Sequence, residues 1–324
     1  MSGSTGGAPL VVFYDPIPGE WSYDIERSVF DPLGVELRIP ADAADADRLI
    51  VDADVVIVTG IGRLSAASIA TLRDPAGLLC YSIGMNQVDG AAAAARGIPV
   101  RNVPGYCADE VADHAVTLLL AIWRHLVPLH TLLSTHGWSA AQTSEHVAAI
   151  RRIKGKTLGI LGAGRIGQKV GERARGFGLR TIAADPFAPG TPELPVVPLH
   201  EMLEQADAIV VCAALTPESR HTLDAEALSH VKPGTLFVNV SRGGLVDEVA
   251  LAAALGDGRI PWAGLDVRDP EPPDPADDLL TGLPNVIITP HIAASSQEAV
   301  DDLHRQAAET AVELMRAAGR LPAA

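Results

Sequence analysis

Three glycines and an aspartate have the spacing of a dinucleotide-binding turn. Gly162, Gly164 and Gly167 stand in G-x-G-x-x-G order between the apolar run 157–161 and a helix-forming segment. The first glycine allows a tight bend, the second lets backbone approach a pyrophosphate, and the third lets helix and strand pack closely. Asp185 ends the next apolar run, where a carboxylate can bind ribose hydroxyls. Because that carboxylate repels a 2′-phosphate, the pattern predicts NAD and disfavours NADP.

Three further residues have complementary acid, base and anion-binding chemistry. Arg242 follows the run LFVNV, Glu271 follows Asp266 in DVRDPEPP, and His291 follows VIITP. A guanidinium can hold a carboxylate through paired hydrogen bonds. An imidazole can exchange a proton with a carbonyl or hydroxyl oxygen at neutral pH, and a nearby carboxylate stabilises the imidazolium. Since all three residues follow predicted strands, we expect them to converge on a nicotinamide.

Each of these residues also has a structural interpretation. Arg242 could neutralise a loop end, Glu271 could be a solvated acid in the loop 269–278, and His291 could be a loop histidine. Their joint position at strand ends favours the catalytic interpretation. No metal site is predicted, because the ten histidines show no recognisable ligand spacing. Ser241 lacks the G-x-S-x-G context of a hydrolase nucleophile.

The elements that position these residues alternate between short apolar runs and helix-forming segments, which predicts parallel sheets of the α/β class. A helix is expected over 108–133, broken near Pro128 and buried between domains or subunits, and an amphipathic helix over 295–320. The chain should therefore form two Rossmann-like doubly wound parallel-sheet domains. The predicted strands are 10–14, 35–39, 55–59, 78–83, 99–103, 157–161, 181–184, 209–214, 235–240, 262–267 and 286–289.

Composition excludes several classes of function. The chain has 324 residues, of which 25 are Lys or Arg and 40 are Asp or Glu, giving a formal charge of −15. A nucleic-acid or anionic membrane partner is therefore not expected. The apolar run 115–123 is too short to span a bilayer. Three cysteines without C-x-x-C spacing, and an N-terminus without a secretion signal, predict a cytoplasmic protein.

Five stretches of the chain carry a further resemblance: GKTLGILGAGRIG, LTPESRHTL, VKPGTLFVNVSRGGLVDE, AGLDVRDPEP and TPHIAAS. They resemble the D-isomer-specific 2-hydroxyacid dehydrogenase family, and the stretch NVPGYCADEVADHAVTLLLA resembles its branch of phosphoglycerate dehydrogenase-like members and C-terminal-binding-protein corepressors. The resemblance implies a cofactor domain, 104–291, inserted into a split substrate domain, 1–103 plus 292–324, with homodimerisation through the cofactor domain.

The resemblance also implies residue roles. Arg242 matches the substrate-binding arginine, Glu271 the carboxylate paired with the histidine, and His291 the proton donor in reduction of a 2-keto acid by NADH. The remaining matches concern the cofactor: Gly162, Gly164, Arg165, Ile166 and Gly167 for the turn, Asp185 for the ribose, and Thr216 and Asp266 for other cofactor contacts, Asp266 with the nicotinamide amide.

The substrate loop departs from the family pattern. The family often has G-x-G-x-D-N-I-D, whereas this chain has SIGMNQVD from Ser82 to Asp89. Backbone N–H groups of Ile83 and Gly84 can still bind a carboxylate, because that needs no side chain. The rest of the substrate pocket is expected from residues 15–23, 61–63 and Tyr106.

Two other functions remain compatible with the sequence. One is an NADH-sensing, corepressor-like binding protein with incidental dehydrogenase activity. The other is a family member acting on formate or phosphite, although neither substrate has the C2 carboxylate that Arg242 would bind. No long charged arm or disordered tail for recruiting partners is evident, which favours the reductase of a small 2-keto acid.

Overall fold

The computed structural model describes residues 7–14, 22–59, 62–138 and 140–323, which divide into two compact units. The first unit is Met1–Cys107 with Ser296–Ala324, and the second is Ala108–Ser295. The second unit is thus inserted into the first. Its boundaries lie four residues beyond the predicted 103/104 and 291/292. The C-terminal shift has a local cause, because Ile292 and Ala293 are bound by hydrogen bonds to a carboxylate of the second unit.

The first unit is a five-stranded parallel sheet in the order β2-β1-β3-β4-β5. This is a doubly wound order, with helices on both faces. Its elements are β1 (Leu10–Tyr14), α1 (Asp24–Phe30), η1 (Asp31–Leu33), β2 (Glu36–Arg38), α2 (Ala43–Leu49), η2 (Ile50–Asp52), β3 (Val55–Val58), α3 (Ala66–Thr71), β4 (Gly77–Cys80), α4 (Gly90–Ala95), β5 (Val100–Asn102) and α12 (Gln297–Ala317).

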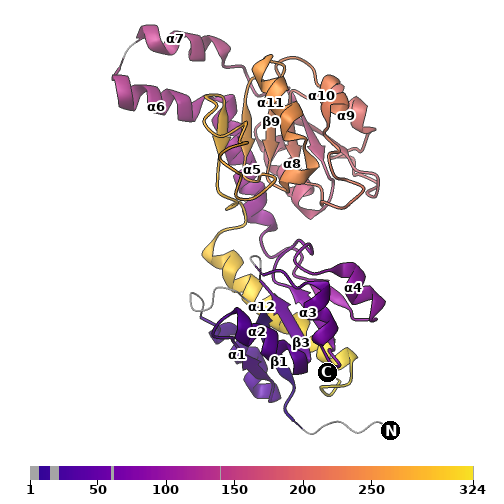
Figure 1. Cartoon of the computed structure of the whole chain (residues 1–324). Coiled ribbons are helices and arrows are strands. Elements are labelled where there is room, and N and C mark those ends of the chain that lie inside the picture. The colour runs from indigo at the N-terminus through magenta and orange to yellow at the C-terminus, as the bar shows by residue number, and fades with distance from the viewer. Residues whose placement is uncertain (1–6, 15–21, 60–61, 139, 324) are drawn as a thin grey trace. The chain divides into compact units, whose positions relative to one another are not determined.

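The C-terminal helix α12 completes the core of the first unit (Figure 1). It begins after Ser296, whose side chain caps the helix by accepting from Ala299 N. Its apolar face packs with Phe30 of α1 on one face of the sheet, while Ile69 of α3 and Ala93 of α4 pack on the other. The amphipathic helix predicted over 295–320 is therefore confirmed, with observed bounds Gln297–Ala317.

The second unit is a six-stranded parallel sheet in the order β11-β10-β9-β8-β6-β7. The strand order reverses at β6, which makes the end of this strand a topological switch point. A single parallel bridge, Ala183 to Val196, marks a rudimentary further strand outside β7. The elements are α5 (Ala108–Trp123), α6 (Leu126–His136), α7 (Ala140–Ala149), β6 (Thr157–Leu161), α8 (Arg165–Gly176), β7 (Arg180–Ala184), α9 (Leu199–Gln205), β8 (Ala208–Val211), α10 (Ala225–Ser229), β9 (Leu236–Asn239), η3 (Gly243–Leu245), α11 (Glu248–Gly256), β10 (Ala263–Leu265) and β11 (Val286–Ile288).

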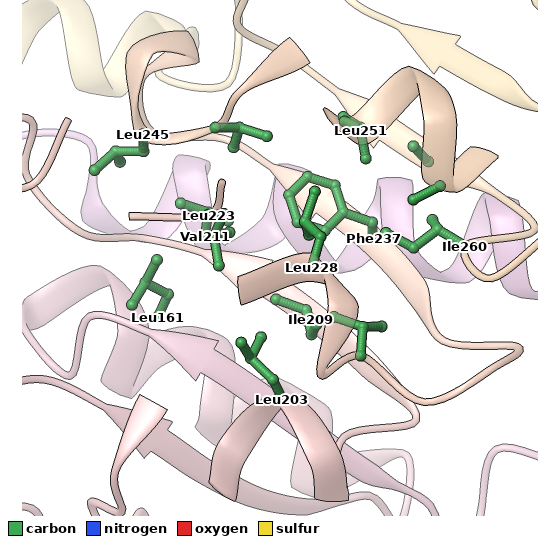
Figure 2. Packing of buried hydrophobic residues seen from close by; sticks show 14 of the residues in the cluster. Leu161, Leu203, Ile209, Val211, Leu223, Leu228, Phe237, Leu245, Leu251 and Ile260 are labelled. Carbon is green, nitrogen blue, oxygen red and sulfur yellow. The ribbon is translucent and has the colours of Figure 1, made fainter. Parts of the chain in front are cut away.

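A continuous apolar core fixes these strands. Figure 2 shows strand residues such as Ile209 and Phe237 packed against Leu203 of α9, Leu228 of α10 and Leu251 of α11. Helices α5 and α8 pack against other parts of the sheet and against each other. Phe237 is fully buried, and burial of such a side chain stabilises the fold by about 1.5–3 kcal/mol.

The predicted long helix over 108–133 is two helices. The break predicted near Pro128 is confirmed, and it lies three residues earlier, at His125, which has φ +52°. Pro128 falls in the first turn of α6, where a missing N–H costs no helical hydrogen bond. The buried residues of α5 pack within the second unit, and the expectation that this segment is also buried between domains or subunits stays a prediction.

No single helix among those described is long and apolar enough to cross a membrane. Helices α5 and α6 satisfy the length and composition only when taken together, and they are bent by 58° at their junction.

Candidate functional site

Each strand of the second unit is followed by one residue that the sequence predicts to be functional. Because all six strands are parallel, these residues lie at the same edge of one sheet. They are Gly162 after β6, Asp185 after β7, Thr216 after β8, Arg242 after β9, Asp266 after β10 and His291 after β11.

A different structural reason favours glycine at each of the three positions of the turn. Gly162 has φ +99°, and a Cβ there would lie 2.7 Å from Ala213 N. A Cβ on Gly167 would lie 2.0 Å from the Gly162 carbonyl oxygen, so only glycine fits between helix and strand. A Cβ on Gly164 would meet nothing within 4 Å among the described residues. That open side of the backbone is where a pyrophosphate would need room.

The first turn of α8 is open to an anion. Gly164 is the N-cap residue, and because it has no side chain it offers no side-chain acceptor to the first N–H groups of the helix. Arg165 and Ile166 are the first two residues of α8. Helix N-terminal N–H groups that lack a side-chain cap bind phosphate readily. The residues present therefore fit the phosphates of a dinucleotide.

The Asp185 carboxylate binds the glycine turn through hydrogen bonds and can still accept another one. Its Oδ2 accepts from Ala163 N at 2.8 Å, and its Oδ1 accepts from Phe187 N at 2.8 Å and Ala188 N at 3.2 Å. A carboxylate has about four acceptor positions, so capacity remains for a ribose hydroxyl. The carboxylate is thus tied directly to the turn it was predicted to accompany.

The structure brings His291 and Glu271 together as the sequence predicted. His291 Nδ1 lies 2.7 Å from Glu271 Oε2, and the two side chains are 43% and 36% exposed. Glu271 Oε1 also accepts from Arg268 N at 2.8 Å. His291 Nε2 meets no hydrogen-bond partner within the described ranges. The pair therefore leaves one imidazole nitrogen available for proton exchange.

The surroundings of Glu271 favour its ionised form. Partial burial by itself would raise the pKa of this carboxyl group. The hydrogen bonds from His291 and from Arg268 N, with the charges of His291 and Arg242, outweigh that effect and hold the pKa below its usual value. Glu271 is therefore an anion at neutral pH and can stabilise an imidazolium.

Asp266 anchors the loop that carries His291. Its carboxylate is buried and accepts from Thr289 Oγ1 at 2.6 Å, Ile292 N at 3.0 Å and Ala293 N at 2.9 Å. Its carbonyl accepts from His291 N at 2.8 Å. These bonds hold His291 at φ +54°, a left-handed conformation that costs free energy in a non-glycine residue. The structure places Asp266 beneath the histidine, and its predicted contact with the nicotinamide amide stays a prediction.

Two supporting groups were missed by sequence reasoning. His114 of α5 reaches Thr289 Oγ1 with its Nε2 at 2.9 Å, and the same nitrogen lies 3.5 Å from Asp266 Oδ1. Arg268, which is 7% exposed, forms two hydrogen bonds of 3.0 and 2.9 Å with the Glu248 carboxylate, which also accepts from Asp269 N. Neither contact has a local sequence signal, because the partners are far apart in the chain.

Arg242 is half-buried and its backbone is fixed. Asn239 Nδ2 donates to the Arg242 carbonyl at 3.0 Å, and Arg242 Nη1 donates to the Ser241 carbonyl at 2.7 Å. A guanidinium has five N–H donors, so most remain for a ligand. Its charge also contributes to the lowered pKa of Glu271.

The remaining predicted site residues are placed as follows. Thr216 lies in an exposed turn where its N–H donates to Ser219 Oγ at 2.7 Å. Ile83 and Gly84 belong to the first unit and follow β4. Of the predicted side-chain pocket, residues 15–21 and Ile61 lie outside the described residues. Among the residues that are described, no three His, Cys, Asp or Glu side chains cluster as a metal site.

Residues 116–293, more than half of the chain, match the family model for the NAD binding domain of D-isomer specific 2-hydroxyacid dehydrogenases. The chain belongs to the D-isomer-specific 2-hydroxyacid dehydrogenase family. It is 36% identical over 270 residues to a hydroxypyruvate reductase of Thermotoga maritima, covering 82% of this chain and 86% of that relative.

A D-3-phosphoglycerate dehydrogenase of Mycobacterium tuberculosis is 37% identical over 283 residues, which is 85% of this chain and 52% of the relative. The chain thus spans about half the length of this longer relative.

Solved structures of other proteins share the fold. The NAD-dependent formate dehydrogenase of Staphylococcus aureus in complex with NAD is 28% identical, with TM-score 0.80 over 98% of this chain and 97% of that chain. An acyclic imino acid reductase in complex with NADPH is 24% identical, with TM-score 0.83 over 97% and 98% of the two chains, and shares only the fold. The fold therefore does not by itself select NAD over NADP.

Proposed function

We propose that this chain is an NAD-dependent D-2-hydroxyacid dehydrogenase that transfers a hydride between NADH and C2 of a 2-keto acid. The observation that carries the proposal is the His291–Glu271 pair, 2.7 Å apart and partly exposed, at the strand ends of a sheet with a dinucleotide-type glycine turn. Family membership supports the same reaction class.

The roles of the protein groups follow from their chemistry. Arg242 binds the substrate carboxylate and polarises the C2 carbonyl, and the N–H groups of Ile83 and Gly84 also bind the carboxylate. In reduction, His291 gives its Nε2 proton to the carbonyl oxygen as C2 receives the hydride, and Glu271 stabilises the imidazolium before the transfer. Oxidation of the hydroxy acid reverses these steps. The bound cofactor supplies or accepts the hydride.

Cofactor binding uses the turn and its neighbours. Gly162, Gly164 and Gly167, with the N–H groups of Arg165 and Ile166, would hold the pyrophosphate. Asp185 would bind the adenosine ribose and repel the 2′-phosphate of NADP, which makes NAD the proposed cofactor. Thr216 and Asp266 complete the proposed set by family resemblance.

The proposed partners are a small 2-keto or 2-hydroxy acid and a second copy of the chain, in the cytoplasm. Helix α6 has no buried residue, and large apolar side chains are exposed on and near α6 and α7: Leu126 63%, Val127 44%, Trp138 91% and Val147 59%. An apolar surface of this kind fits a homodimer through the cofactor-binding unit. The charge of −15 gives no reason to propose a nucleic-acid or membrane partner.

The test is NADH oxidation at 340 nm against a panel of 2-keto acids, with NADPH run in parallel. Rapid, saturable turnover of one member with NADH is expected and identifies the substrate class. Tight NADH binding without turnover of any member would contradict the reductase and favour the NADH-sensing alternative.

A further inference from the structure

The loop after β4 departs from the family pattern at four positions, Ser82, Asn86, Gln87 and Val88, and two of these residues contact each other. Ser82 and Gln87 replace the glycine and asparagine of G-x-G-x-D-N-I-D. Gln87 Nε2 donates to Ser82 Oγ at 3.0 Å, and Ser82 Oγ donates to the Gly84 carbonyl at 2.8 Å. The two departures therefore compensate for one another by forming a continuous chain of hydrogen bonds.

Three successive carbonyl groups of this loop accept hydrogen bonds from other groups of the first unit. The Ser82 carbonyl accepts from Val103 N at 3.1 Å, the Ile83 carbonyl from Asn102 Nδ2 at 2.6 Å, and the Gly84 carbonyl from Ser82 Oγ at 2.8 Å. In a planar trans peptide, the carbonyl and the next residue's N–H point in opposite directions. The N–H groups of Ile83, Gly84 and Met85 must therefore point away from these tethers.

These three N–H groups form no hydrogen bond with any residue in the described ranges. Ile83 and Gly84 are half-buried and Met85 is 52% exposed, while Gln87 beneath them is 7% exposed. Backbone N–H groups are strong donors that need an acceptor, either water or a ligand. The tether, in which Gln87 is buried, thus holds a row of donors that no described residue occupies, an arrangement suited to an anion.

We infer that Ser82, Gln87 and Asn102 are positioning residues that hold the N–H groups of Ile83, Gly84 and Met85 for a substrate carboxylate. The inference rests on the proposed function and adds Met85 N–H to the predicted donors. A loop fixed before binding loses less conformational entropy when the ligand arrives. In this chain, the hydrogen bonds of the Ser82 and Gln87 side chains would thereby hold the loop that has glycine and asparagine at these positions in the family pattern.

The test compares Ser82→Ala and Gln87→Leu with Ser82→Thr, which keeps the hydroxyl. Ser28→Ala is the matched control, because the Ser28 hydroxyl donates to the Ile25 carbonyl at 2.6 Å in α1 of the same unit. The measurements are KM and kcat for the best 2-keto acid, NADH affinity by fluorescence, and thermal unfolding.

Loss of the tether should raise KM about three- to tenfold, the range expected from one neutral hydrogen bond. We expect kcat at saturation and NADH affinity to stay within about twofold, because the cofactor turn and His291 are unchanged. Ser82→Thr should restore most of the wild-type KM, and Ser28→Ala should match wild type. An unchanged KM in Ser82→Ala, or a loss that Ser82→Thr does not restore, would overturn the inference.

Oxamate binding to the protein–NADH complex, measured by calorimetry, separates this inference from the proposed function. If wild type binds oxamate but turns over no keto acid, the reductase proposal fails, and the same three- to tenfold weakening in Ser82→Ala supports the loop. If wild type turns over a keto acid while Ser82→Ala changes neither KM nor oxamate affinity, the loop inference alone fails. Absence of oxamate binding to wild type overturns the carboxylate site.

Discussion

Two of the histidine–glutamate pairs among the described residues have almost equal length but lie in opposite surroundings. In the second unit, His291 Nδ1 lies 2.7 Å from Glu271, and the side chains are 43% and 36% exposed. In the first unit, His304 Nδ1 lies 2.6 Å from Glu26, and the side chains are 3% and 0% exposed. Tyr81 Oη also donates to Glu26 at 2.8 Å. The same two residue types therefore occur once at a strand-end loop and once inside a core.

The difference in solvent access assigns the two pairs different roles. An exposed imidazole can change its protonation state and reach a substrate, whereas buried polar groups must keep their hydrogen-bond partners. Burial and the charge of Glu26 raise the pKa of Tyr81 above its usual range, so its hydroxyl stays a donor to that carboxylate. The buried pair joins α12 to α1, and it therefore links the C-terminal segment of the first unit to the N-terminal segment of the same unit. The exposed pair is the candidate for chemistry.

The largest expected effect is on turnover through the exposed pair. His291→Ala should lower kcat by about two to four orders of magnitude, the usual contribution of a positioned acid or base. NADH affinity and thermal stability should stay near those of wild type, because the side chain is 43% exposed. Steady-state kinetics with NADH titrations check this. A variant that retains most of its activity would remove His291 from the mechanism.

The buried pair should show the reverse pattern. His304→Ala removes one hydrogen-bond partner of the buried Glu26 carboxyl group, which typically destabilises a protein by about 1–3 kcal/mol. Denaturant unfolding measures this loss, while kcat per folded molecule should be unchanged. His200→Ala, at an exposed histidine of α9, is the control and should unfold as wild type does. Equal stability of the His304 and His200 variants would contradict the structural role.

A smaller effect concerns pH. Folding lowers the pKa of Glu271 from 4.5, so this carboxylate is ionised at neutral pH beside His291. Glu271→Gln removes that charge, and the rate of keto-acid reduction should therefore begin to fall at a lower pH. Because the folded pKa is depressed, the stability that Glu271 contributes is present above pH 4.5 and is lost on acidification. A pH–rate profile identical to that of wild type would show that the Glu271 charge does not influence proton transfer by His291.

The smallest expected change concerns cofactor choice. Asp185→Ser removes the carboxylate but keeps a short polar side chain at the end of β7. NAD affinity should fall, and the preference for NAD over NADP should shrink by about tenfold, the effect of roughly 1.4 kcal/mol. Parallel kinetics with NADH and NADPH measure the ratio. If the ratio does not move, Asp185 does not select the cofactor and serves only to hold the turn through Ala163 N.

Local sequence was sufficient for the features set by local geometry. Gly162 and Gly167 could be assigned because a positive φ and a 2.0 Å approach to backbone leave no room for a Cβ. The pairing of His291 with Glu271 could be predicted because both residues follow adjacent strands of a parallel sheet. The C-terminal helix could be predicted from its amphipathic period, and its contribution to the core of the first unit follows the family pattern.

Features that depend on distant contacts could not be predicted. His114 looks like one polar residue in an apolar helix until Thr289 is brought within 2.9 Å by folding. Arg268 gains its role only when Glu248 folds against it. Pro128 indicated a break nearby but not its position, because proline also fits the first turn of a helix, and only the structure places the break at His125.

The central claim is direct hydride transfer from NADH to C2 of a 2-keto acid under the control of His291. The most direct test uses NADH carrying deuterium at the transferred C4 position, with the best keto acid of the panel and product analysis by NMR and chiral chromatography. We predict a D-2-hydroxy acid with one deuterium at C2 from wild type, and a strongly reduced yield from His291→Ala. A product without deuterium at C2, or the L isomer, would contradict the proposed reaction.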